Sequence, residues 1–219
     1  MKNVKGKVLL FILFLVPILL FLVWKNAKER YTPLEVHGDV EADGSLSPWT
    51  LRDFTLFDQD GDTVNLNTFD NQIIVANFFY ATCPNICPKM NNNLRLVVEK
   101  YRNSDEISFI SHSVDPDQDN VDSLKKYSKI YGYSTAKWRF LTGYKTEIYD
   151  LAENSYHIVA ASPDGEHDFI HSTITVLIDK ERRVRGFYES YNNPMFVKEL
   201  KDGIKVLLAE YHSPNMQMP

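Results

Sequence analysis

The sequence predicts an α/β domain in which helices flank a central mixed sheet. Apolar runs of strand length alternate with stretches whose apolar residues recur at helical spacing, which is typical of a sheet covered by helices on both faces. Near the C-terminus, two strand-like runs are separated only by the charged turn KERR, which predicts an antiparallel pair. The sheet is therefore expected to contain both parallel and antiparallel strands.

The composition fits one folded domain with an appendage. Of the 219 residues, 44% are hydrophobic and 13% are aromatic, which is enough for a substantial core. The formal net charge is -5, and no long basic run lies outside the N-terminus. We therefore expect no nucleic-acid partner.

The N-terminus predicts a single transmembrane helix. Residues 8–24 carry no charged side chain, and as a helix they would span about 26 Å, at the short end for a bilayer core of about 30 Å. Trp24 and the flanking lysines can extend the segment into the interface. The alternative is a cleaved signal peptide, but the following WKNAKERY has no clear small-x-small cleavage motif.

This anchor sets the expected organisation of the chain. Residues 1–7 would be cytoplasmic, and the soluble part would lie on the extracytoplasmic, periplasmic side, where paired cysteines can close. Residues 25–48 are polar with Gly and Pro and are expected to be a tether. Residues 49–211 would form the domain. Residues 212–219 are expected to be a disordered tail, although they contain His and Met side chains that can bind copper.

The domain is expected to start with a β-hairpin and a buried strand. Asp60-Gly61 is a favourable turn dipeptide, and alternating apolar residues flank it within residues 49–66. Residues 71–80, NQIIVANFFY, form an almost continuous apolar run of strand length. The two cysteines of the chain follow directly, and the apolar residues of the next segment, from Met90 to Tyr101, fall at helical spacing.

Strands and helices are expected to alternate over the rest of the chain. The predicted elements are a strand at 106–114, a helix at 116–132, a strand at 137–143, a helix at 144–156, an antiparallel pair at 172–179 and 184–190, and a helix at 193–212. In this order the two cysteines occupy a turn between a strand and a helix. A thioredoxin-like fold places its thiols at such a turn.

Cys83 and Cys87 are the strongest candidates for chemistry. Pro88 suits the first turn of a helix, so Cys83 would lie in the loop and Cys87 in the opening turn, facing the same way. A helix N-terminus favours the thiolate form. Two thiolates favour a soft ion, Cu(I) above all, and they can also close into a disulfide.

A third ligand would come from the six histidines. His112 is expected to be a core residue, and a surface role is expected for the pair that flanks a loop, His157 and His167. His171 stands where the loop SPDGEHDFI enters a strand, and in a thioredoxin-like fold that loop passes beside the cysteine turn. We therefore select His171 as the third metal ligand.

The motifs FFYATCPNICPKM, SHSVDPDQDNVDSLKKY, WRFLTG and FIHSTITVLID resemble the Sco (SenC/PrrC) family in order and spacing. The resemblance covers about residues 48–211 and the N-terminal anchor. It implies a thioredoxin-like metallochaperone that binds one copper ion per chain through Cys83, Cys87 and His171. It also implies a role in assembling the dinuclear copper site of cytochrome c oxidase. The implied partners are the copper-bearing oxidase subunit and a copper donor protein.

Two departures from the family pattern concern residues around the ligands. Mitochondrial members usually have an aspartate immediately before the histidine, whereas here Ile170 stands there and Asp168 lies two residues earlier. Asn85 stands between the cysteines, where an acid is common. Asp168 and Asp115 remain candidates for hydrogen bonding to the ligands. For Asp115 and the nearby Asp119, capping of the next helix is at least as strong an expectation.

Rival functions use the same cysteines. A thiol-disulfide oxidoreductase, reducing the oxidase subunit or acting as a redox sensor, is the first alternative. Three residues between the cysteines, and His171-Ser172 where a thioredoxin has proline, both count against it. A peroxiredoxin-like pattern is weaker still. A purely structural disulfide would close so small a loop that it would stabilise little.

Overall fold

The computed structural model describes residues 6, 11–21, 32–132, 136–158 and 172–212. The chain divides into two units, Met1–Thr32 and Pro33–Pro219. In the first unit, residues 11–21 are helical and exposed. The predicted transmembrane segment extends beyond these residues at both ends. Within the described part of the chain, no helix combines the length and hydropathy of a membrane span.

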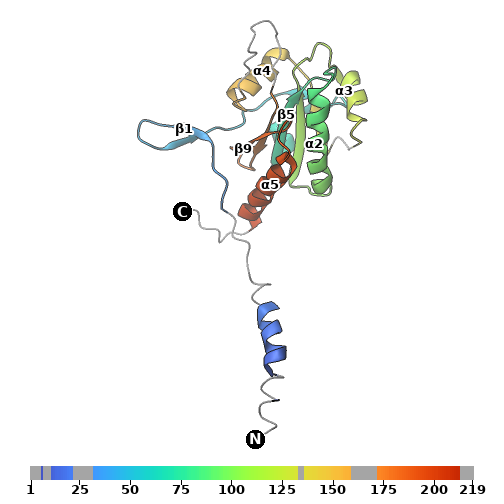
Figure 1. The fold of residues 1–219 in the computed structure, drawn as a ribbon. Coiled ribbons are helices and arrows are strands. Elements are labelled where there is room, and N and C mark those ends of the chain that lie inside the picture. The colour runs from blue at the N-terminus through green and yellow to red at the C-terminus, as the bar shows by residue number, and fades with distance from the viewer. Residues whose placement is uncertain (1–5, 7–10, 22–31, 133–135, 159–171, 213–219) are drawn as a thin grey trace. The chain divides into compact units, whose positions relative to one another are not determined.

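The second unit is built on a five-stranded mixed sheet, as predicted (Figure 1). The strand order is β7-β6-β5-β8-β9. The first three strands are parallel to one another, while β8 is antiparallel to both β5 and β9. The strands are β5 (Ile73–Phe79), β6 (Ile107–Ser113), β7 (Trp138–Leu141), β8 (Ile174–Ile178) and β9 (Val184–Glu189). Both β5 and β6 are buried along their whole length, which explains the almost continuous apolar sequence of β5. In β6 polar side chains, among them Ser111 and His112, are buried as well.

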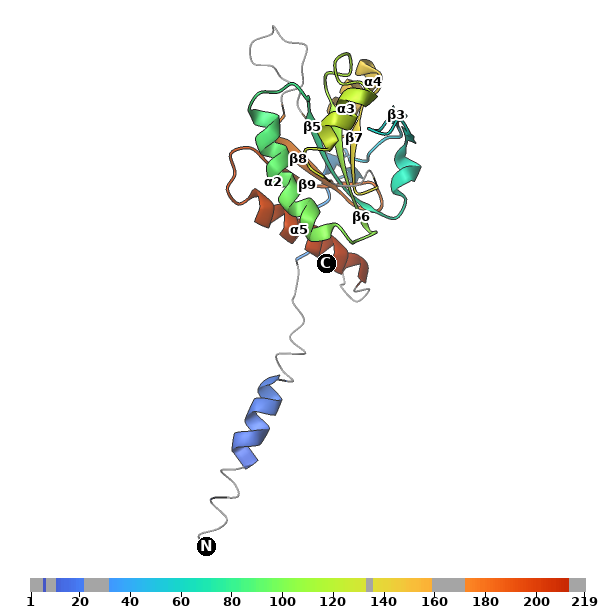
Figure 2. The same ribbon diagram turned by 90° about the vertical axis from the view of Figure 1, so that its right-hand side faces the viewer.

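Helices cover both faces of this sheet (Figure 2). Alternate side chains of β5 enter different cores: Ile74, Ala76 and Phe78 enter one, and Val75 and Phe79 the other. The second core is completed by α2 (Ile86–Tyr101), α3 (Val121–Ser128) and α5 (Phe196–His212), and the first by α4 (Lys145–Asn154) and the 3₁₀ helix η1 (Leu66–Phe69). The predicted α/β class is confirmed.

Two hairpins precede the sheet. The predicted one consists of β3 (Leu56–Phe57) and β4 (Thr63–Val64), and its turn contains Gly61 at φ 86°, a conformation that favours glycine. A second hairpin, β1 (Gly38–Val40) and β2 (Leu46–Pro48), was not predicted and lies in the segment expected to be a tether.

The chain before this second hairpin is tied to the sheet. The guanidinium of Arg185, on β9, donates hydrogen bonds to the carbonyls of Leu34 and Glu35, and the N–H of His37 donates to the carbonyl of Val184. The side chain of Glu210, on α5, accepts from Arg185 and from the N–H of Leu34. The structure therefore differs from the tether expectation over these residues.

Candidate metal centre

Cys83 and Cys87 lie in the turn between β5 and the start of α2, as predicted. Helix α2 begins at Ile86, so Cys83 precedes it and Cys87 belongs to its first turn together with Pro88. The thiols are 7% and 5% exposed and are not joined in a disulfide. The turn thus holds two nearly buried cysteines on the face of the sheet covered by α2.

Hydrogen-bond donors converge on the sulfur of Cys83. The N–H of Cys87 donates to its Sγ at 3.3 Å. The nearby N–H of Asn85 and the side chain of Tyr80 also act to lower the pKa of this thiol. Burial alone would raise the pKa of the Cys83 thiol, but these donors outweigh burial and lower the pKa below its ordinary value. The arrangement favours a thiolate at Cys83.

Cys87 has a different environment. Burial raises the pKa of its thiol to about 12, and the Cys83 sulfur and the charge of Asp119 add to this effect. The N–H of Tyr80 acts to lower the pKa of Cys87 but does not reverse the shift. In the metal-free pair, Cys83 therefore loses its proton at a lower pH than Cys87.

Both sulfurs open onto a small apolar pocket of about 160 Å³. The residues that line it are Phe78, Phe79, Tyr80, Cys83, Ile86, Cys87, Met90, Ser172 and Thr173. Two adjacent thiols in an apolar pocket suit a soft, weakly hydrated cation such as Cu(I). They do not suit Mg²⁺ or Ca²⁺, which require several oxygen ligands. The described residues therefore fit the predicted copper ion by donor type.

The third predicted ligand, His171, and its neighbour Asp168 lie outside the described residues. The residues directly after His171, Ser172 and Thr173, line the pocket of the cysteines. Among the described residues, no group of three or more His, Cys, Asp or Glu side chains could hold a metal ion. The histidine ligand thus remains a prediction.

Asp119 holds the cysteine turn in place, a role that the sequence analysis missed. Its buried carboxylate accepts hydrogen bonds from the N–H of Ala81 at 2.9 Å and from the hydroxyl of Ser113 at 2.6 Å. These bonds join the loop after β6 to the loop after β5. The expectation that aspartates cap the next helix was wrong, because Asn120 caps α3 by accepting from the N–H of Ser123.

Asp115, the other described candidate for hydrogen bonding to a ligand, is half-buried. Its charge acts on Tyr80, whose pKa is raised to about 12, first by burial, then by the adjacent cysteines and Asp115. Asp115 therefore lies near the site. Its backbone N–H donates to the hydroxyl of Ser113, and its carbonyl accepts from N–H groups of its own loop.

Other described histidines have structural surroundings. His112 is fully buried, as expected for a core residue, and its Nε2 lies 2.9 Å from the hydroxyl of Tyr156. His157 stacks on Trp49, with ring centroids 4.1 Å apart, and His212 forms an ion pair with Glu106. None of them lines the pocket of the cysteines.

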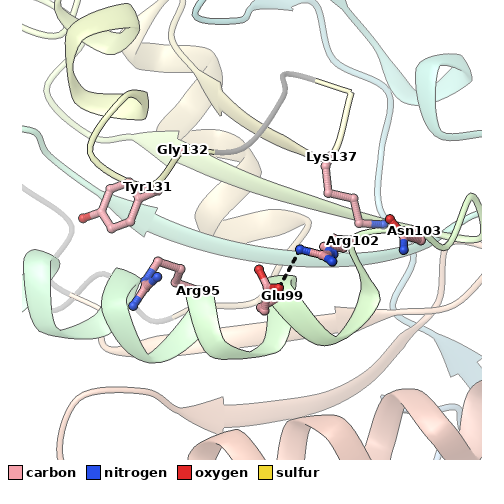
Figure 3. Close-up of a pocket in the computed structure, with 7 residues that line it drawn as sticks. All are labelled: Arg95, Glu99, Arg102, Asn103, Tyr131, Gly132 and Lys137. Atoms are coloured by element: carbon pink, nitrogen blue, oxygen red, sulfur yellow. Dashed lines mark hydrogen bonds and ion pairs between the residues drawn. The ribbon is translucent and has the colours of Figure 1, made fainter.

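A larger surface pocket of about 420 Å³ lies along the C-terminal half of α2 (Figure 3). Its lining residues are Arg95, Glu99, Arg102, Asn103, Tyr131, Gly132 and Lys137. Arg102 pairs with Glu99 at 2.9 Å, and the ammonium of Lys137 donates to the carbonyls of Ser104 and Ile107. This lining contains neither thiol nor imidazole, so it does not provide the ligands of a copper site.

Comparison with known proteins identifies the family. The SCO1/SenC family model matches residues 43–204, which include the cysteine turn, both parallel crossovers and most of α5. The chain belongs to the SCO1/SenC family. A curated SCO1/SenC relative, the SCO1 protein homolog of Bacillus subtilis, is 30% identical over 156 residues, covering 70% of this chain and 81% of that protein.

Solved Sco structures share the fold. BsSco, described as a member of the Sco family of cytochrome c oxidase assembly proteins with a disulfide switch, is 29% identical, with a TM-score of 0.62 over 73% of this chain and 94% of that chain. Arabidopsis thaliana ScoI, solved with copper bound, is 27% identical, with a TM-score of 0.60 over 74% of this chain and 99% of that chain. The fold described above is thus the Sco fold.

Proposed function

We propose that this SCO1/SenC chain is a copper metallochaperone with a thioredoxin-like domain. It binds one copper ion through Cys83, Cys87 and His171 and assists assembly of the dinuclear copper site of cytochrome c oxidase. Family membership supports this proposal, together with the copper bound by Arabidopsis ScoI and the oxidase-assembly role stated for BsSco.

The single observation that carries the proposal is the pair of buried cysteines that line one apolar pocket. Thiolates are the preferred ligands of Cu(I), and a low-coordinate Cu(I) site needs only two or three of them. Ser172 and Thr173 line the same pocket, which supports His171 as the additional ligand because it immediately precedes them in the chain. Copper is here the cargo that the protein passes on.

The proposal includes a membrane anchor and an extracytoplasmic domain. The uncharged residues 8–24 support a single-pass anchor with residues 1–7 in the cytoplasm. The domain would then meet its partners, the copper-bearing oxidase subunit and a copper donor protein, on the periplasmic side. A mature chain that starts after Trp24, detected by mass analysis of the membrane-expressed protein, would contradict the anchor.

A second candidate function is thiol-disulfide exchange with the cysteines of the oxidase subunit. The unequal thiols support it, because exchange needs one activated thiolate and one resolving thiol. The disulfide switch described for BsSco, a relative at 29% identity, points the same way. The two functions are compatible, since the pair must be reduced before it can bind copper.

Metal analysis of the purified full-length chain tests the proposal. After reduction and removal of reductant, the chain is mixed with excess Cu(I), desalted and analysed for copper per chain. We expect one copper when the chain is reduced and almost none when the cysteines are oxidised, because a disulfide offers no thiolate. Equal copper retention by the reduced and oxidised chains would contradict the proposed site.

Two histidine variants test the third ligand. Cu(II) prefers nitrogen and oxygen donors in tetragonal geometry, so it depends on the imidazole more than Cu(I) does. His171→Ala should lose the thiolate-to-Cu(II) absorption band and keep measurable Cu(I) binding. His167→Ala, a matched change in the same loop, should alter neither property. The opposite pattern in the two variants would exclude His171.

A further inference from the structure

The surface pocket along the C-terminal half of α2 gathers positive charge (Figure 3). Arg95 lies on α2, Arg102 directly follows its last residue, and Lys137 immediately precedes β7. Among the described residues that line the pocket, Glu99 is the single carboxylate, so three cations and one anion give a net charge of +2. A cavity lined by an excess of one charge attracts ligands of the opposite charge.

Lys137 holds its ammonium group in a fixed, nearly buried position. The residue is 7% exposed, and its Nζ donates to the carbonyls of Ser104 at 2.7 Å and Ile107 at 2.6 Å. An ammonium group has three N–H donors, so one donor lacks an acceptor among the described residues. Burial lowers the pKa of Lys137 to about 8, although the nearby Asp105 acts in the opposite direction, so the group is charged at pH 7.

We propose that this pocket binds a phosphate group, either as the free ion or as the monoester of a small organic molecule. The pocket is separate from the proposed copper site. Arg95 and Glu99 follow Cys87 in the same helix, about 12 and 18 Å further along its axis. The inference therefore goes beyond the proposed function and does not depend on copper.

The arrangement of the donors favours phosphate over a carboxylate. Figure 3 shows Arg95 at one end of the pocket, and Arg102, Asn103 and Lys137 together at the other. A tetrahedral phosphate group presents oxygens in several directions, and paired guanidinium N–H groups match two of them. A carboxylate has only two oxygens, which lie in one plane. The volume of about 420 Å³ also lies within the usual range for small-molecule pockets, about 300–1,000 Å³.

The ion pair between Arg102 and Glu99 provides a test with opposite signs. The two side chains are 59% and 53% exposed and lie 2.9 Å apart, so neither supports the core. A bound phosphate would accept from the Arg102 guanidinium and would be repelled by the Glu99 carboxylate. Arg102→Gln should therefore weaken phosphate binding, and Glu99→Gln should strengthen it.

A second exposed ion pair is the matched control. Arg52 and Asp150 lie 2.8 Å apart, and their side chains are 50% and 54% exposed. Neither residue lines the pocket. Arg52→Gln and Asp150→Asn therefore change the net charge of the chain by the same amounts as the pocket variants, at a different place.

Calorimetric titration of the metal-free, full-length chain with inorganic phosphate tests the inference. The chain is kept in non-ionic detergent at pH 7 and low salt. We expect saturable binding of one phosphate, about tenfold weaker in Arg102→Gln and about threefold tighter in Glu99→Gln. Arg52→Gln and Asp150→Asn should stay within about twofold of wild type. No saturable binding below about 10 mM phosphate, or equal effects in the two pairs of variants, would overturn the inference.

Two further titrants test the class of ligand. Acetate should bind at least about tenfold more weakly than phosphate, and an equal affinity for acetate would contradict a phosphate site. Glycerol 3-phosphate distinguishes the sources of the phosphate group. Tighter binding than inorganic phosphate would support the site and assign it to an organic monoester, and weaker binding would support the site and assign it to the free ion. Because no copper is present, these results do not depend on whether the metallochaperone proposal holds.

Discussion

The cysteine turn and His112 place possible metal ligands on opposite faces of the same sheet, in very different surroundings. The two thiols lie under α2 and open onto a pocket, whereas His112 is enclosed on the other face by Phe78, Phe54 and Tyr156. The strands that carry them are neighbours, since Phe78 of β5 pairs with His112 of β6. Position in the sheet therefore does not distinguish a binding site from a core residue.

The difference lies in access and in hydrogen-bond donors. At Cys83, several donors stabilise a charged sulfur beside a cavity. At His112, burial lowers the imidazole pKa to about 3, and Nδ1 has no hydrogen-bond partner among the described residues. A soft metal can enter the first site, whereas the second excludes both a proton and an ion. A side chain that can bind a metal therefore forms a binding site only where a cavity reaches it and nearby hydrogen-bond donors stabilise its charged form.

The largest expected effect comes from removing either thiol. Cys83→Ser or Cys87→Ser should lower Cu(I) affinity by more than about 100-fold, because groups that merely hydrogen-bond to ligands are already worth 10–100-fold. His112→Gln should leave Cu(I) affinity within a fewfold of wild type. Competition with a chromophoric Cu(I) chelator measures all three variants. A strong loss of Cu(I) affinity in folded His112→Gln would contradict the distinction between the cysteine turn as a binding site and His112 as a core residue.

A smaller effect should separate the two cysteines. At neutral pH, iodoacetamide should modify Cys83 at least about 30-fold faster than Cys87. Their pKa values lie on opposite sides of the ordinary thiol, and the lower nucleophilicity of a low-pKa thiolate offsets part of that gap. Peptide mass analysis of the reduced, metal-free chain measures both rates. Equal rates, or faster modification of Cys87, would show that the donors around Cys83 do not activate it.

A further test concerns the acid sensitivity of the His112 environment. Between about pH 3 and 6.5, His112 takes up a proton in the unfolded chain and not in the folded one, so its contribution makes stability rise with pH in this window and level off above it. The slope should be about 1.4 kcal/mol per pH unit, or tenfold in the folding equilibrium. Denaturant unfolding at several pH values measures it.

His112→Phe is the control for that slope. The variant leaves the Tyr156 hydroxyl without its imidazole partner, which lowers stability by a constant amount but adds no titration in this range. Its pH dependence should therefore be shallower than that of wild type. Identical slopes in the two proteins would mean that His112 is already protonated in the fold or reaches water.

The smallest effect is expected at Asp119, which supports the cysteine turn from outside. Asp119→Asn retains one oxygen acceptor but loses the charge that strengthens the bonds from Ala81 and Ser113. We expect a loss of about 1 kcal/mol in stability and about fivefold in Cu(I) affinity. Asp117→Asn, an exposed change in the same loop, should change neither quantity. Equal effects from both changes would remove the special role of Asp119.

Much of the fold could be predicted because its signals are local. The run NQIIVANFFY predicts β5, and the helical spacing that starts near Met90 predicts α2, so the position of Cys83 and Cys87 between them could also be predicted. The positions of these elements follow from apolar periodicity and from nearby proline and glycine residues. Tertiary packing determines the order of the strands in the sheet but does not change where these elements begin and end.

The β1–β2 hairpin was missed although its sequence carries a usable signal. Its residues are mostly polar and small, so composition indicates a tether. Asp43-Gly44, however, is the same kind of dipeptide as Asp60-Gly61, and Gly44 adopts φ 83°. Val40 and Leu46 pair directly across this turn. The dipeptide Asp43-Gly44 is a stronger indication of a hairpin than the polar composition of the segment is of a tether.

The supporting residues of the site could not be predicted from local sequence. Asp119 acts on Ala81, which lies 38 residues earlier, and only the neighbouring positions of β5 and β6 bring their loops together. Tyr80 stands in the apolar run and has the sequence signature of a strand residue. Its carbonyl accepts a hydrogen bond from the N–H of Cys83 because the turn folds back on the end of the strand.

The central claim is that the two sulfurs of this turn hold copper in the reduced chain. X-ray absorption at the copper edge of the reduced, Cu(I)-loaded, full-length protein tests it most directly, because it identifies the atoms bound to the metal. We predict two sulfur neighbours from Cys83 and Cys87 and one nitrogen neighbour that disappears in His171→Ala. A first coordination shell of nitrogen and oxygen only, with one copper per chain, would contradict the account.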